Sequence, residues 1–207
     1  MHKFHRIPHM PFSLQVHRDD KIHSDPEIFV NKLVVITEKL DGSCTSLHDG
    51  ETFSKSGDKA CGKWFSVIKA NYATKTCFSK RTFFGETMYA KHSIFYDKLS
   101  EWFYLFAIMN EDGIILDWKD IANNGIFKTV PVLFVGTFDS IYDIENFMMA
   151  EIENPSAFGN EREGFVIRLA HKFHINDAET CVAKFVRKDH VQTDIHWTKT
   201  WIPNKLA

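Results

Sequence analysis

The sequence predicts an α+β fold built on antiparallel sheets. Short runs of β-branched and aromatic residues recur along the chain, Asp-Gly pairs favour hairpin turns, and only a few segments lengthen to the apolar period of a helix. Strands and helices do not alternate strictly, as they would around a parallel sheet. Because the 207 residues contain no repeat, low-complexity tract or linker, we expect one domain that spans residues 1–207.

The first third of the chain is rich in predicted strands. The run Leu33–Thr37 is β-branched and is soon followed by Asp41-Gly42, which indicates a buried strand that ends in a turn. Farther on, Ser46–Asp49 and Glu51–Ser56 flank a second Asp-Gly pair. Such a pair supplies the positive φ angles of a two-residue hairpin turn, so we expect these two segments to pair with each other.

The rest of the chain adds helices and further strands. Between Gly62 and Ala73 apolar residues recur at helical spacing, which predicts an amphipathic helix. Shorter helical patterns run from Trp118 to Asn123 and from Ser140 to Met149. The remaining predicted strands are Arg81–Glu86, Glu101–Met109, Val130–Gly136, Gly164–Leu169 and Thr180–Val186.

The bulk composition is ordinary for a soluble globular protein, with 44% hydrophobic and 25% charged residues. A formal net charge of -2 excludes a generally basic nucleic-acid-binding domain, so a polyanionic partner would have to bind in a local groove. The four cysteines lack zinc-finger spacing and indicate free thiols in the cytoplasm. No stretch approaches the roughly 20 apolar residues that cross a membrane, so we expect no membrane partner.

Lys39 lies just after the first predicted strand and just before its turn. Such a position can present an amine to a ligand. A lysine that attacks a phosphate at neutral pH needs its ordinary pKa of about 10.4 offset by burial or by a nearby cation. The pattern Lys39-x-Asp41-Gly42 alone also fits an ordinary exposed lysine at a strand end.

Three later stretches carry residues of related chemistry. Glu86 follows a glycine that lets the backbone approach a ligand, and its carboxylate suits a ribose hydroxyl. Phe106 lies in a strand of alternating aromatic residues, so its ring can stack on a purine while others form the core. Glu163 precedes a glycine and a strand, where a carboxylate can hold Mg²⁺ against phosphate oxygens. Taken singly, each of these also fits an ordinary structural role.

A fifth stretch, Val182–Lys188, ends the series. Side chains of a strand alternate between its two faces, so Lys184 and Arg187 are not expected in one pocket. The order and type of all five stretches, from about Leu33 to Arg187, match one set of motifs. The chain resembles the covalent nucleotidyltransferase superfamily of ATP-dependent DNA ligases, RNA ligases and messenger RNA capping enzymes.

The resemblance implies an antiparallel-sheet nucleotidyltransferase domain of the ATP-grasp-like ligase adenylation type, with no separate OB domain. It makes Lys39 the adenylated nucleophile and assigns Glu86 to the ribose and Phe106 to the base. It gives Glu163 the metal step and Lys184 the α-phosphate. The other nucleotide contacts that it implies are Glu38 to adenine, Asp41, Gly42, Lys55 and Arg187. The implied cofactors are ATP and Mg²⁺, with Mn²⁺ as an alternative metal.

Several details resemble a group of small single-domain RNA ligases from bacteria and viruses. DNA ligases and capping enzymes usually carry arginine two residues after the motif glycine, where this chain has Cys44. The flanking phrases that resemble this group are Arg6–His9, Gly85–Ile94 and Phe185–Val191. Two positions depart from the family pattern. Lys55 stands where an arginine is general, and valines flank Lys184 where a second lysine is common, so the phosphate contacts need not match in detail.

The resemblance therefore predicts an ATP-dependent RNA ligase that works in three steps: Lys39 attacks ATP, AMP moves to a 5'-phosphate, and a 3'-hydroxyl displaces AMP. The expected partner is RNA with 5'-phosphate and 3'-hydroxyl ends, in RNA repair. Recognition of those ends would rest on this domain or on a partner protein. Two alternatives stay open, a GTP-dependent capping-type nucleotidyltransferase and a non-catalytic RNA-end-binding module.

Overall fold

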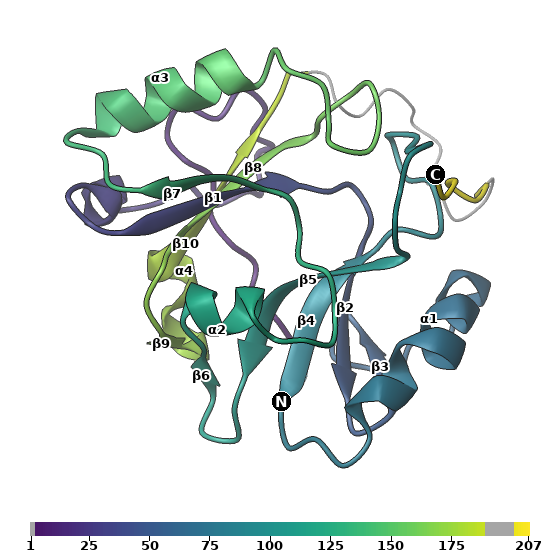
Figure 1. Cartoon of the computed structure of the whole chain (residues 1–207). Helices are drawn as coiled ribbons and strands as arrows, with labels where there is room; N and C mark the ends of the chain where they lie inside the picture. Colours follow the sequence, from purple (N-terminus) through teal and green to yellow (C-terminus); the bar gives the residue numbers. More distant parts are fainter. Residues whose placement is uncertain (1–2, 189–200) are drawn as a thin grey trace.

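A computed structural model describes residues 3–188 and 201–207, and its strands form two antiparallel sheets (Figure 1). The four-stranded sheet has the order β10-β8-β1-β7 and the six-stranded sheet the order β3-β2-β4-β5-β6-β9. The first sheet consists of β1 (Val34–Lys39), β7 (Val132–Gly136), β8 (Gly164–Leu169) and β10 (Val182–Val186). The second consists of β2 (Ser43–His48), β3 (Glu51–Ser54), β4 (Thr82–Thr87), β5 (Phe103–Met109), β6 (Ile114–Ile115) and β9 (Phe173–His174). The predicted α+β class with antiparallel sheets is confirmed.

Helices cover the outer sides of the two sheets. The longest, α3 (Ile141–Glu151), lies along the four-stranded sheet, while α1 (Ser66–Asn71) lies beside the six-stranded sheet (Figure 1). Two shorter helices are α2 (Trp118–Ala122) and α4 (Ala178–Cys181). Ser140 caps α3, because its Oγ accepts a hydrogen bond from the amide of Asp143 at 3.2 Å. Among the described residues, no helix is long and apolar enough to cross a membrane.

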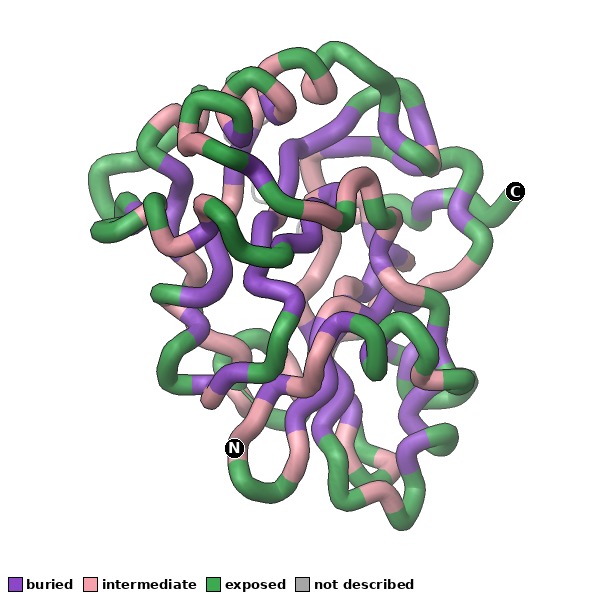
Figure 2. Tube along the Cα trace, turned by 60° about the vertical axis from the view of Figure 1, so that its left-hand side comes forward, coloured by how far each residue is buried: buried purple, intermediate pink, exposed green. Residues whose placement is uncertain are grey.

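One continuous hydrophobic core joins the two sheets. Figure 2 shows buried chain through the middle of the molecule and exposed chain mainly at its edges. Ile36 and Phe165, on neighbouring strands of the four-stranded sheet, are fully buried, as is Phe103 in the six-stranded sheet. This shared core holds the two sheets in a fixed relation to each other.

The chain passes directly from one sheet to the other at the end of β1. Lys39 is the last residue of β1, and β2 begins at Ser43 in the other sheet. A side chain at Gly42 would place its Cβ 2.5 Å from the carbonyl oxygen of Thr87, so this crossing requires a glycine. Lys39 is therefore held where the two sheets meet.

Some predicted elements differ from the structure at their ends. The helix predicted from Gly62 to Ala73 is interrupted, with α1 flanked by 3₁₀ turns, and no side chain caps its first turn. Thr180 was predicted in a strand but lies in α4, where its carbonyl oxygen contacts the ring of His23 at 2.9 Å. The predicted hairpin is confirmed, since Asp49 and Gly50 both have positive φ. Asp189 to Val191, the end of one family-like phrase, lie outside the described residues.

Candidate active site

A cavity of about 270 Å³ lies between the two sheets. Its walls come from several parts of the chain. The four-stranded sheet contributes Thr37, Lys39, Val166, Arg168, Val182 and Lys184, and the six-stranded sheet contributes Cys44, Glu86, Phe106 and Ala107. The N-terminal segment contributes Phe4, His5, Arg6 and Ile7, and Lys55 follows the end of β3. Seven of the residues predicted to act on the nucleotide thus line one cavity, namely Glu38, Lys39, Gly42, Lys55, Glu86, Phe106 and Lys184.

Strand pairing explains why the charged residues of the four-stranded sheet share one face. Val166 on β8 pairs with Thr37 on one side and with Lys184 on the other, so these three side chains point to the same face. Lys39 lies two residues beyond Thr37 and faces the same way. The pleat of the sheet therefore brings Lys39 and Lys184 to one wall of the cavity.

Lys39 is ion-paired with Glu163. Its Nζ donates a hydrogen bond to Glu163 Oε1 at 2.5 Å, and the Glu163 side chain is only 6% exposed. Burial lowers the pKa of Lys39, but Glu163, followed by Glu86 and Asp41, outweighs burial and raises this pKa above its ordinary value. Lys39 is thus an ammonium ion in this arrangement, and a cation that offset the charge of Glu163 would favour its free amine.

Glu86 lies across the cavity from the four-stranded sheet, at the end of β4. Burial raises the pKa of its carboxyl to about 8, although the positive charge of Lys39 acts in the opposite direction. Cys44 pairs with Glu86 across β2 and β4, and burial raises the pKa of its thiol to about 12. Because only a thiolate is a strong nucleophile, Cys44 is chemically inert beside Lys39.

Phe106 presents its ring to the cavity from β5. The ring of Phe4, in the N-terminal segment, meets it edge-on with a centroid distance of 5.2 Å and an interplanar angle of 79°. Phe4 makes a similar edge contact with Phe84 at 5.3 Å. An aromatic surface of this kind can accept a flat base by stacking.

Asp41 and Glu38 direct their carboxylates away from the lining of the cavity. Asp41 Oδ2 accepts hydrogen bonds from the amides of Ser93 and Ile94 at 2.7 and 2.8 Å, which ties the loop after β4 to the Lys39 crossing. Glu38 precedes Lys39 on β1, so its side chain points to the opposite face of the sheet. There it is 1% exposed and accepts hydrogen bonds from Ser156 and from the amide of Ala157. Any contact of Glu38 with adenine would therefore have to come from its main chain.

Two arginines near the site, Arg187, which was predicted to contact the nucleotide, and Arg168, direct their guanidinium groups to other partners. The guanidinium of Arg187 pairs with Glu161 at 2.7 Å, and Arg187 is not among the described residues that line the cavity. This agrees with the alternation expected for β10. Arg168 lines the cavity, but its guanidinium donates to the carbonyl oxygens of Leu169 at 3.0 Å and Leu116 at 3.1 Å.

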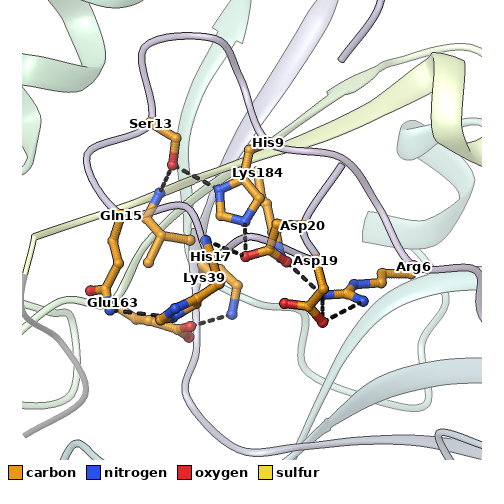
Figure 3. A network of polar contacts seen from close by, with 11 residues as sticks. Arg6, His9, Ser13, Gln15, His17, Asp19, Asp20, Lys39, Glu163 and Lys184 are labelled. Carbon is orange, nitrogen blue, oxygen red and sulfur yellow. Dashed lines mark hydrogen bonds and ion pairs between the residues drawn. The ribbon is translucent and has the colours of Figure 1, made fainter. Parts of the chain in front are cut away.

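A polar network reaches Lys184 from the N-terminal segment, and no sequence pattern predicts it. The carboxylate of Asp20 lies 2.7 Å from Arg6, 3.2 Å from His9 and 3.5 Å from Lys184 (Figure 3). In the sequence, Arg6–His9 stands out only as a flanking phrase that resembles the small RNA ligases. No local pattern could have linked Asp20 to Lys184, because the two residues lie at opposite ends of the chain.

The described carboxylates near Lys39 do not by themselves form a complete metal-binding site. In residues 3–188 and 201–207, no group of three or more histidine, cysteine, aspartate or glutamate side chains is placed to hold a metal ion. Mg²⁺, however, is usually bound by one or two carboxylates together with water and substrate phosphates. Glu163 is not among the described residues that line the cavity, but its buried carboxylate contacts Lys39, which does line it, and fits that mode of binding.

Comparison with known proteins agrees with this geometry. The sequence profile of the RNA ligase family matches residues 32–186. A structure of Naegleria gruberi RNA ligase with PPi is similar, with a TM-score of 0.57, 18% identity and coverage of 87% of this chain and 59% of that one. An archaeal ATP-dependent RNA ligase is also similar, with a TM-score of 0.57, 11% identity and coverage of 89% and 48%. A structure of a mutant Naegleria gruberi RNA ligase with ATP and Mn is similar too, with a TM-score of 0.53, 16% identity and coverage of 91% of this chain and 60% of that one.

The chain thus spans less than two thirds of the length of these ligases. No curated protein sequence matches it closely enough to count as a relative. The family profile nevertheless covers most of the chain and includes β1, β4, β5, β8 and β10, the strands that carry the predicted site. The chain belongs to the RNA ligase family.

Proposed function

We propose that this protein is an ATP-dependent RNA ligase that joins 5'-phosphate and 3'-hydroxyl ends through a lysyl-AMP on Lys39 and an adenylated RNA. The observation that carries the proposal is the position of Lys39, whose amine lies on the cavity wall 2.5 Å from Glu163. Similar ligases in complex with ATP and Mn, or with PPi, support a nucleotide and a pyrophosphate in such a cavity.

The first step forms a bond between Lys39 Nζ and the α-phosphorus of ATP and breaks the bond to the β-phosphate, so that pyrophosphate leaves. Lys39 must attack as a free amine, and its ion pair with Glu163 must therefore open. A divalent cation held by Glu163, Mg²⁺ or Mn²⁺, would supply charge that offsets the phosphate oxygens. Lys184 and Lys55, on the walls of the same cavity, add the positive charge of the chain itself.

The base and ribose would lie against the six-stranded sheet. Phe106 offers its ring for stacking, and Glu86 can hydrogen-bond a ribose hydroxyl in either protonation state. In the later steps the AMP passes to a 5'-phosphate, and a 3'-hydroxyl then displaces it. Both steps transfer a phosphoryl group at the same place, so the same lysines serve all three.

We further propose that this one domain, residues 1–207, suffices for adenylation, that the protein acts in RNA repair in the cytoplasm, and that a partner protein can assist in recognising the RNA ends. A GTP-dependent capping-type enzyme would share the lysyl-nucleotide step with a different nucleotide. A non-catalytic RNA-end-binding module would form no adduct at all.

Intact-mass spectrometry after incubation with ATP and Mg²⁺ or Mn²⁺ separates these possibilities. We expect one AMP on the wild-type chain and none on Lys39→Ala, because the attacking amine is lost. Lys59→Ala is the matched control, since Lys59 is an exposed lysine that pairs with Glu51. An adduct formed only with GTP would favour the capping enzyme. An adduct that persists in Lys39→Ala would show that Lys39 is not the nucleophile.

A further inference from the structure

We propose that Asp20 is a positioning residue that holds the amine of Lys184 at the place where the α-phosphate of ATP binds. The inference rests on the proposed adenylation function. Asp20 Oδ1 lies 3.5 Å from Lys184 Nζ, and the two side chains are only 7% and 16% exposed (Figure 3). In such a shielded place an ion pair is little weakened by solvent, so it can fix the direction of a long side chain.

Asp20 is itself held from several sides. Its Oδ2 accepts a hydrogen bond from the amide of His17 at 3.0 Å and lies 3.2 Å from His9 Nε2. Its Oδ1 accepts from Arg6 at 2.7 Å. The carboxylate therefore has little freedom to turn, and it presents a fixed negative charge to Lys184.

The ring of His9 is oriented by a chain of hydrogen bonds. Ser13 Oγ accepts from the amide of Val186 at 2.9 Å and lies 2.9 Å from His9 Nδ1. Because the carboxylate of Asp20 opposite Nε2 can only accept, the tautomer that suits this site carries its hydrogen on Nε2 and accepts from Ser13 at Nδ1. Burial, together with Lys184, lowers the pKa of His9 to about 4, so the ring is neutral at pH 7.

The main chain of the same segment is fixed to Lys184. The amide of Lys184 donates to the carbonyl oxygen of Pro8 at 2.9 Å, and the amide of Met10 donates to the carbonyl oxygen of Lys184 at 2.8 Å. The amide of Leu14 donates to Val186 at 3.1 Å. The N-terminal segment thus runs along β10 and holds both the backbone and the amine of Lys184.

The charges around Lys184 show why such a partner is useful. Burial lowers the pKa of Lys184, Asp20 opposes this shift by favouring the charged amine, and Lys39 and Arg6 add to the lowering. Glu163 is a further carboxylate whose charge interacts with Lys184. An amine that stays charged and fixed in direction can stabilise the growing charge on the phosphate oxygens without rearranging first.

The first test compares Asp20→Asn with Asp19→Asn. Asp19 also contacts Arg6, at 3.3 Å, but its side chain is 78% exposed, and among the described residues Lys184 pairs with Asp20 instead. We expect single-turnover adenylation at saturating ATP to slow about 100-fold in Asp20→Asn, as a misplaced catalytic group does. Asp19→Asn should stay close to the wild-type rate, and Asp20→Glu should recover part of the loss. A wild-type rate in Asp20→Asn would overturn the positioning role while leaving the ligase proposal intact, whereas an inactive wild-type chain would overturn both.

A second test adds Asp20→Asn to Lys184→Ala. If Asp20 acts through Lys184, the double variant should adenylate no more slowly than Lys184→Ala alone. If Asp20→Asn only impaired folding, it would instead slow adenylation equally in the wild-type chain and in Lys184→Ala. A further slowing of the same size in the double variant would therefore show that Asp20 acts independently of Lys184 and would overturn the inference.

Discussion

The two walls of the cavity differ in chemical character. The four-stranded sheet presents Lys39 and Lys184, with the ion-paired carboxylate of Glu163 beside them. The six-stranded sheet presents an aromatic ring, Phe106, and a carboxyl group, Glu86, whose pKa is raised by burial. One wall is therefore suited to phosphates and the other to a nucleoside, and we refer to them as the phosphate wall and the nucleoside wall.

The joint between the walls carries the reacting group. Lys39 ends β1 on the phosphate wall, and the chain enters β2 of the nucleoside wall within four residues. A nucleotide bound across both walls would thus have its α-phosphate, which links the nucleoside to the other phosphates, close to this joint. A change in either wall should therefore affect adenylation, through the rate of the chemical step on the phosphate wall and through the KM for ATP on the nucleoside wall.

The largest effect in this comparison is expected from Glu163→Gln on the phosphate wall. Gln has nearly the shape of Glu but lacks the charge that attracts the metal, so we expect the adenylation rate to fall about 100- to 1,000-fold with the fold intact. Glu161→Gln is the matched control, because Glu161 is half exposed and pairs with Arg187. Rates should be measured across a Mg²⁺ titration. If Glu161→Gln were impaired and Glu163→Gln were not, the metal carboxylate would be Glu161.

A smaller effect is expected from Phe106 on the nucleoside wall. Loss of stacking typically costs about 1–3 kcal/mol per base, so Phe106→Ala should raise the KM for ATP about 5- to 150-fold. Phe106→Leu retains most of the packing volume and should lose less. Initial rates over a range of ATP concentrations would show the difference. Equal KM values for the wild type and both variants would mean that Phe106 does not stack on the base and only packs in the core.

The sequence predicted the strands of both walls well, because each strand has a local pattern. Short β-branched and aromatic runs gave β1, β4, β5 and β8 to within a few residues. The two-residue strands β6 and β9 were missed, since β6 shares only one residue pair with β5 and β9 pairs with β6 across a long stretch of sequence. Local patterns carry no information on such pairing.

The sequence motifs identified residues of the candidate site but not the direction of every side chain. Lys39, Glu86 and Phe106 do line one cavity, but the pleat of β1 turns the carboxylate of Glu38 to the other face. The network around Asp20 could not be predicted, because it depends on how the N-terminal segment runs along β10. Motif order thus identifies residues, while strand pairing decides which of their atoms reach the cavity.

The smallest effect, on stability and its dependence on pH, concerns Glu86. Its folded-state pKa is raised from 4.5 to about 8, chiefly by burial. Between these values the folded chain keeps a proton that the unfolded chain has released, so this residue makes the free energy of unfolding fall as pH rises from 5 to 8. Glu86→Gln has no such proton, and its stability relative to the wild type should therefore increase over that range. Urea unfolding at pH 5 and pH 8 would measure the trend, with Glu51→Gln, an exposed position on the same sheet, as the control. A difference that stays constant with pH would mean that Glu86 is ionised in the folded chain throughout, and the nucleoside wall would then be as charged as the phosphate wall.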